Sequence, residues 1–146
     1  MGAGAVLVII LVGLLAFGAF SGLDQFQGKA FGWRLALYPI AAVIVPLAWK
    51  LSGSRQPYPY AADMLLVAPF LVDVLGNTFD LYDSIDRWDD ANHFVNWALL
   101  CGALGSVLLR TSLGPPVLFG LVAGFGAAAA ILWEIGEYFA FIRNSP

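Results

Sequence analysis

Residues 3–23 have the sequence AGAVLVIILVGLLAFGAFSGL, which contains no charged side chain in 21 consecutive positions. As an α-helix, a segment of this length spans about 31 Å, close to the thickness of the hydrocarbon core of a bilayer. A secretory signal peptide has a basic start and a shorter apolar centre, and this stretch has neither feature. The stretch therefore predicts a first transmembrane helix and not a cleaved leader.

The composition of the whole chain agrees with a membrane location. Of its 146 residues, 60% are hydrophobic and 12% are charged, and the mean hydropathy is +0.81. Soluble domains carry about 25% charged residues, and a chain of this size has a large surface to cover. The net charge of −3 and the seven basic residues exclude the basic surface of a nucleic-acid-binding protein. Cys101, the single cysteine, lies in an apolar run, which predicts a buried structural thiol.

Apolar runs predict an all-α membrane bundle of about five transmembrane helices, forming one domain over residues 1–146. A short amphipathic acidic segment is expected between the third and the fourth helix. Pro39 and Pro46 lie inside the second helix and predict a kink, because proline removes a backbone donor. Glycine pairs of the GxxxG type predict close helix contacts at Gly18–Gly22 and Gly120–Gly124. The predicted spans cover residues 3–23, 33–51, 61–78, 91–109 and 116–142.

Basic residues in the connections divide almost evenly between the two sides of this topology. Three basic residues lie on one side and four on the other. Arg87, one of the four, has acidic neighbours that reduce its contribution to the orientation. Acidic residues contribute little to orientation. We expect the N-terminus on the inner side and the acidic segment on the outer side.

Polar residues inside or beside the apolar runs follow helical spacing. A carboxylate at the centre of a transmembrane helix costs about 2.5–3.5 kcal/mol, so such residues are expected to face the interior and one another. Residues three, four or seven apart lie on one face of a helix. The three resulting stripes are Asp73, Asn77 and Asp80; Asp89 or Asp90 with His93 and Asn96; and Glu134, Glu137 and Tyr138.

Each stripe also has a structural interpretation. The acidic residues at 80–90 can form a solvated interfacial helix whose apolar side is Leu81, Ile85 and Trp88. His93 can pair with a neighbouring aspartate as a local structural contact. The two glutamates can form an internal salt bridge with Arg87 or Arg143.

The functional hypothesis is a metal or polar-headgroup site. Acidic and histidine ligands three residues apart on two helices are typical of metal-binding bundles, although those normally use two histidines. Mg²⁺, Mn²⁺ or Ca²⁺ suits carboxylates best, so a divalent cation is the expected cofactor class. General acid–base catalysis by His93 or Glu134 and a proton relay through Asp73, His93 and Glu134 are alternatives. The metal hypothesis names Asp89, Asp90, His93, Glu134 and Glu137, with Asp73 and Asn77 in a second layer.

Two motifs carry a resemblance to known proteins: D-x-x-x-H-F at residues 89–94 and W-E-x-x-E-Y at residues 133–138. In this order they resemble the YjdF-like family of uncharacterised bacterial multi-pass membrane proteins, and more distantly VanZ-like membrane proteins. The resemblance covers residues 73–143 and implies a bacterial cytoplasmic membrane, without an activity. Such proteins usually continue past the position of Pro146 into a further apolar helix, so we expect either a short member or a truncated sequence.

Two roles follow from these observations. The first is a multi-pass membrane protein with an internal acidic and histidine site for a cation or a polar headgroup, with enzymatic activity undecided. The second is an accessory or structural subunit of a larger membrane complex, for which the lipid bilayer and other membrane subunits are the expected partners.

Overall fold

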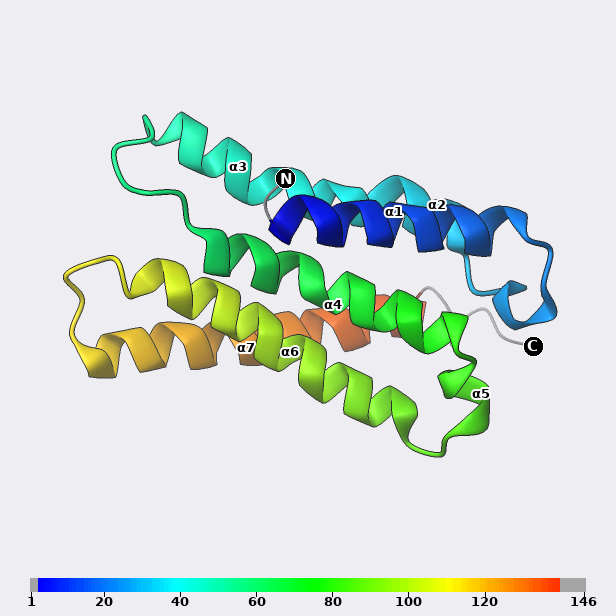
Figure 1. Cartoon of the computed structure of the whole chain (residues 1–146). Coiled ribbons are helices and arrows are strands. Elements are labelled where there is room, and N and C mark those ends of the chain that lie inside the picture. Colours follow the sequence, from blue (N-terminus) through cyan, green and yellow to red (C-terminus); the bar gives the residue numbers. More distant parts are fainter. Residues whose placement is uncertain (1–2, 140–146) are drawn as a thin grey trace.

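The computed structural model describes residues 3–139, except the side chains of Ala3 and Glu137. Within these residues the chain forms helices and no strand, and Figure 1 shows them as an elongated bundle. The elements are α1 (Ala3–Phe20), η1 (Asp24–Phe26), α2 (Phe31–Leu37), η2 (Tyr38–Ile40), α3 (Ala41–Leu51), α4 (Tyr60–Thr78), α5 (Leu81–Ser84), α6 (Trp88–Leu108) and α7 (Pro115–Glu137).

Four helical segments of the described chain are long and apolar enough to cross a membrane. They are Phe31–Leu51, which joins α2, η2 and α3, together with Tyr60–Thr78, Trp88–Leu108 and Pro115–Gly136. The first apolar helix is shorter than predicted, because the chain leaves it at Ser21 and turns at Gly22, whose φ is 70°. Its apolar part, Gly4–Phe20, falls below the length of the other four, so its role as a fifth span stays a prediction.

Helix α4 forms the centre of the bundle. It packs against α1 on one side and α6 on the other, and the core joins Leu11 and Leu15 of α1 to Val67 and Val74 of α4. Helix α7 packs mainly against α6 and exposes most of its remaining apolar surface. In a bilayer such a surface contacts lipid, so the sparse burial of this helix is consistent with a membrane environment.

Proline shapes the second membrane-crossing segment. The helix changes from α to 3-10 geometry at Tyr38–Ile40, around Pro39, and returns to α at Ala41. The change of helix type falls at Pro39, the helix continues through Pro46, and the predicted kink stays a prediction. The connection before this segment is tied to α4, because Gln25 donates to the carbonyl oxygens of Asn77 and Thr78 at 3.2 and 2.9 Å.

The acidic segment between α4 and α6 is not one amphipathic helix. Only α5 is helical, and Asp80 before it and Arg87 after it have left-handed backbones with φ of 56° and 65°. These two turns divide the acidic residues between α5 and the start of α6. Trp88 begins α6 three residues before the predicted start, which places Asp89 and Asp90 in its first turn, where the helix dipole favours carboxylates.

The glycine contacts differ from the predicted pairs. Gly18 does meet a neighbouring helix, since an added Cβ would lie 2.3 Å from the Phe31 ring. No such neighbour stands within 4 Å of Gly22, Gly120 or Gly124. The contact between α6 and α7 instead uses Gly126, where an added Cβ would lie 2.7 Å from the sulfur of Cys101.

Candidate functional site

Asp73 is the centre of a polar network inside the bundle. The side chain of Arg34 in α2 donates from Nη1 to Oδ2 of Asp73 at 2.7 Å, and the Tyr38 hydroxyl donates to the same oxygen at 2.8 Å. Arg34 and Tyr38 are four residues apart, so one face of the segment presents both donors to α4. The positive charge of Arg34 balances the negative charge of Asp73. The two donors also satisfy Oδ2, because a carboxylate oxygen can only accept hydrogen bonds.

The other carboxylate oxygen of Asp73 is also occupied. Its Oδ1 accepts from the Tyr82 hydroxyl at 2.7 Å and lies 3.4 Å from Nδ2 of Asn77, which also donates to the Asp73 carbonyl oxygen at 2.9 Å. Burial first, and then the Asp73 carboxylate, raises the pKa of Tyr82 above its usual value. The Tyr82 hydroxyl therefore keeps its proton and acts as a donor to Asp73.

The network continues from α5 to α6. Nδ2 of Asn92 donates to the Tyr82 oxygen at 2.6 Å. The single hydroxyl proton of Tyr82 already goes to Asp73, so Asn92 has to present its NH₂ group to Tyr82 and turn its Oδ1 elsewhere. That Oδ1 is buried and has no hydrogen-bond donor among the described residues, and the same holds for Oδ1 of Asn96, one turn later.

This network forms one wall of a cavity of about 540 Å³ between α2, α4, α5, α6 and α7. Its lining combines charged and polar side chains with apolar and aromatic ones. The polar lining is Lys29, Arg34, Tyr38, Asp73, Tyr82, Asp89, Asn92, His93 and Asn96, and the larger apolar lining is Trp33, Leu37, Phe70, Trp97, Leu100 and Trp133.

Two further charge contacts flank the cavity. Lys29 lies 2.6 Å from Asp83 of α5, and its hydrogen bond holds the pKa of the Asp83 carboxyl below the usual range. Nδ1 of His93 lies 3.8 Å from Oδ2 of Asp89, and the His93 ring meets the Trp133 ring edge to face at 6.5 Å. Each lysine or arginine on the wall thus has a carboxylate within 2.7 Å, whereas Asp89 has a looser contact with His93.

Comparison with known families gives a match over nearly the whole chain. Residues 6–142 match the family described as "Predicted membrane protein (DUF2238)". The chain belongs to this family. Comparison with curated proteins gives no match, and comparison with solved structures gives none either. Membership of DUF2238 supports the prediction of an uncharacterised multi-pass membrane family, and the narrower YjdF-like and VanZ-like resemblance stays a prediction.

Two of the three predicted stripes in this DUF2238 member meet at the cavity. Asp73 of α4 and both Asp89 and His93 of α6 line it, and Asn77 supports Asp73 from the same helix. The third stripe does not join them in the described structure. Glu134 is exposed and lies outside the cavity lining, where its neighbour Trp133 takes part instead.

The predicted metal ligands are only partly brought together. Asp89 is the aspartate that pairs with His93, while Asp90 is exposed and outside the cavity lining. Within residues 3–139, no group of three or more His, Cys, Asp or Glu residues stands close enough to hold a metal ion. The side chain of Glu137 and all of Arg143 lie outside the described residues, so the five-ligand site stays a prediction.

The partners of Asp73 were not identified from the sequence. The spacing of the acidic residues assigns no role to Arg34, Tyr38, Tyr82 or Asn92. A signal was present, because Arg34 and Tyr38 are four residues apart in an apolar segment and so share one helix face. A buried carboxylate needs a cation and hydroxyl donors, and this pair supplies both.

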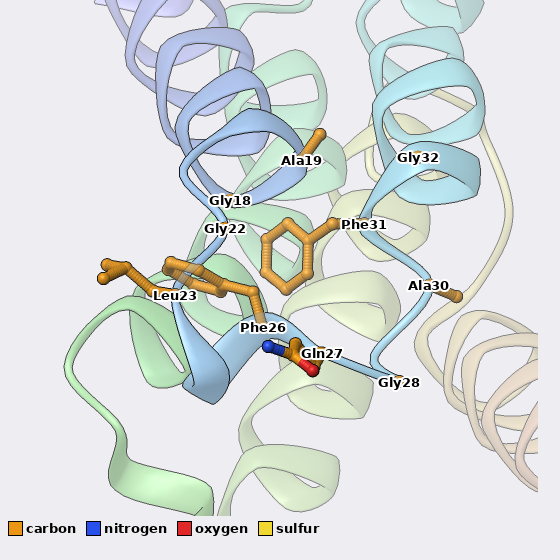
Figure 2. Close-up of a pocket in the computed structure, with 10 residues that line it drawn as sticks. All are labelled: Gly18, Ala19, Gly22, Leu23, Phe26, Gln27, Gly28, Ala30, Phe31 and Gly32. Carbon is orange, nitrogen blue, oxygen red and sulfur yellow. The ribbon is translucent and has the colours of Figure 1, made fainter.

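A second hollow of about 430 Å³ lies where α1 ends and α2 begins. Figure 2 shows the Phe31 ring directed toward Gly18, with Phe26 beside it. Gln27 contributes the one polar side chain of this lining, and its Nε2 donates to Asp24 at 2.7 Å. The lining of this hollow therefore has no charged side chain and a single hydrogen-bonding one, unlike that of the Asp73 cavity.

Proposed function

We propose that this protein binds the polar headgroup of a membrane amphiphile in the Asp73 cavity. The observation that carries the proposal is the mixed lining, in which a neutralised polar network and several aromatic and aliphatic side chains border one cavity. Small-molecule sites are typically apolar cavities of about 300–1,000 Å³ with a few fixed polar groups. The location expected for this function is the bacterial cytoplasmic membrane.

Along α6 the polar lining residues precede the apolar ones, an order that suits an amphiphile. Arg34, Asn92 and Trp133 all lie near the same end of the bundle, close to the start of α2, the start of α6 and the end of α7. Leu100 lies twelve residues into α6, about 18 Å from its first residue. A headgroup among the polar residues therefore leaves its chain directed toward the middle of the bilayer.

The outer edge of the cavity favours entry from lipid. Trp33 and Leu37 of α2 line the cavity and are 72% and 55% exposed, and Trp133 of α7 lines it and is 47% exposed. Side chains that border a cavity and also face outward lie at its rim. An amphiphile then has a lateral path between α2 and α7 and need not cross the packed interface of α4 with α6.

The Asp73 network is better suited to orienting a headgroup than to holding a metal ion. Both oxygens of Asp73 accept hydrogen bonds from Arg34 and two tyrosines at 2.7–2.8 Å. A metal ion at Asp73 would have to displace these donors. The network is therefore interpreted as a rigid, electrically neutral wall, and Asp89 is the carboxylate of the lining that no lysine or arginine of the described residues pairs with.

The test is the amount of lipid that remains bound to the purified protein. Replacing Leu100 by Trp fills the apolar part of the cavity, and Leu37→Trp does so from its outer rim. Leu121→Trp makes the same change on the exposed surface of α7. We expect native mass spectrometry to show several-fold less bound lipid in both cavity variants and unchanged lipid in Leu121→Trp. Equal lipid occupancy in all three folded variants would refute the proposal.

The subunit hypothesis stays a prediction with a separate test. Purification in a mild detergent, followed by measurement of the mass of the complex, distinguishes a monomer from an assembly with other chains.

A further inference from the structure

We propose that the ligand of the Asp73 cavity is a lipid whose headgroup carries a primary ammonium, contacted by Asp89 and by the side-chain oxygens of Asn92 and Asn96. This inference rests on the proposed function, because it names the chemical class of the amphiphile. It is carried by the hydrogen-bonding and charged groups of the wall that the protein itself does not use.

The charges of the wall favour a cation. Arg34 is paired with Asp73 at 2.7 Å and Lys29 with Asp83 at 2.6 Å, so both cations are compensated by carboxylates. Among the described residues, Asp89 forms an ion pair with His93 at 3.8 Å and with no lysine or arginine, and two thirds of its side chain is exposed. Asp89 is therefore the lining carboxylate that can pair with a cationic headgroup, and it disfavours an anionic one.

The hydrogen-bonding groups lead to the same conclusion. The hydroxyls of Tyr38 and Tyr82 donate to Asp73, and the amide NH₂ of Asn92 donates to Tyr82. Oδ1 of Asn92, a residue only 5% exposed, and Oδ1 of Asn96 accept nothing from the described residues. Both residues line the cavity, but these oxygens are buried, so a ligand reaches them when the two side chains turn toward it. Because a buried acceptor without a donor is costly, a ligand that brings N–H groups gains most here. A primary ammonium brings three.

The aromatic lining adds a second attraction for a cation. Trp33, Trp97 and Trp133 come from three different helices and all line the cavity. The face of a tryptophan ring attracts ammonium groups through its negative electrostatic potential. This contribution does not require an N–H group, so it predicts that a quaternary ammonium binds less well than a primary one but better than an anion.

The experiment offers the full chain three lipids with identical acyl chains in equal amounts. They are phosphatidylethanolamine, phosphatidylcholine and phosphatidylglycerol, and native mass spectrometry measures the fraction of protein bound to each. We expect phosphatidylethanolamine to be preferred over phosphatidylglycerol by about tenfold, with phosphatidylcholine between them. Free ethanolamine at the same concentration is expected not to displace the lipid, since it lacks the chain that fills the apolar part.

Matched variants separate the contributions of the wall. Asp89→Asn removes the cavity carboxylate, while Asp90→Asn makes the same change on an exposed neighbour outside the cavity lining. Asn96→Leu removes one acceptor and Asn96→Asp retains it. We expect Asp89→Asn and Asn96→Leu each to reduce the preference about fivefold, Asp90→Asn to keep it, and Asn96→Asp to keep or increase it, because it adds a carboxylate.

The two proposals fail in different ways. Lipid binding that is insensitive to Leu100→Trp refutes the headgroup site as a whole. Two results overturn the ammonium assignment alone, provided that binding depends on Leu100. One is a preference for phosphatidylglycerol, and the other is an ethanolamine preference that persists in both Asp89→Asn and Asn96→Leu. Displacement by free ethanolamine would show an amine site that does not require a lipid.

Discussion

Replacing Arg34 by Met leaves Asp73 as a carboxylate without a cation. At a separation of 2.7 Å the direct attraction is about 6 kcal/mol with an effective dielectric constant of 20. Much of this is offset by the cost of removing both charges from water. Breaking a buried pair from one side costs about 3–5 kcal/mol, and a quarter of the Arg34 side chain is exposed to screening. We therefore expect Arg34→Met to reduce the free energy of unfolding by about 3 kcal/mol.

A double-mutant cycle isolates the contact from the loss of each side chain. Asp73→Asn keeps the shape of the side chain and removes its charge, and the pair Arg34→Met with Asp73→Asn contains no unpaired ion. We expect a coupling free energy of about 2 kcal/mol. Reversible unfolding in mixed micelles, followed by tryptophan fluorescence, measures all four proteins. A coupling free energy below about 0.5 kcal/mol would refute the view that these two charges stabilise one another.

Two further predictions test the surroundings of the network. An added Cβ at Gly76 would lie 2.6 Å from Nε1 of Trp88, so Gly76→Ala should reduce the free energy of unfolding by about 1–3 kcal/mol. Gly124 has no neighbour within 4 Å, so Gly124→Ala should change the free energy of unfolding little. Equal effects of the two substitutions in the same unfolding assay would contradict this packing. Lys29 lowers the pKa of Asp83 in the folded state. The pair therefore stabilises the fold fully above the pKa of Asp83 in the unfolded chain, about 3.9. This stabilisation is lost as the pH falls through the lower pKa of the folded state. The difference in stability between the wild type and Asp83→Asn should therefore shrink with acidification below about pH 4, and a difference that grows would refute the sign of the shift.

The helices were predictable because lipid constrains the sequence strongly. Backbone polar groups have no water to bond in the hydrocarbon core, so spans are long, apolar and helical. The four longer segments therefore lie close to their predicted positions. Helix ends were less predictable, since a turn at Gly22 or at Arg87 depends on a backbone angle that composition does not reveal. The same left-handed residue at 87 explains why α6 begins at Trp88 and not at Ala91.

The site was predictable only in part, because sequence spacing gives the face of a helix but not its partner. Helical spacing grouped Asp89 with His93 and Asp73 with Asn77, and both groups border the same cavity or support its wall. Spacing could not show that α2 would supply Arg34 to Asp73, since that contact joins residues 39 positions apart. Nor could it show that Glu134 is exposed beside Trp133, because a rotation of one residue moves a helical side chain by about 100°.

The depth of the charges changes the interpretation of Asp73. Flanked by apolar residues, it was expected to carry the cost of a carboxylate at the centre of a span. Asp73 lies five residues before the end of α4 and Arg34 three residues after the start of α2, which places them about 8 and 5 Å from those ends. The cost of a charge is lower near the interface than at the bilayer centre, and each charge here also has its partner within 2.7 Å. The membrane therefore tolerates this pair at one end of the bundle. The pair lies nearer the end of the bundle than its middle, so the position that lowers the cost of the charges also brings the network closer to the proposed headgroup.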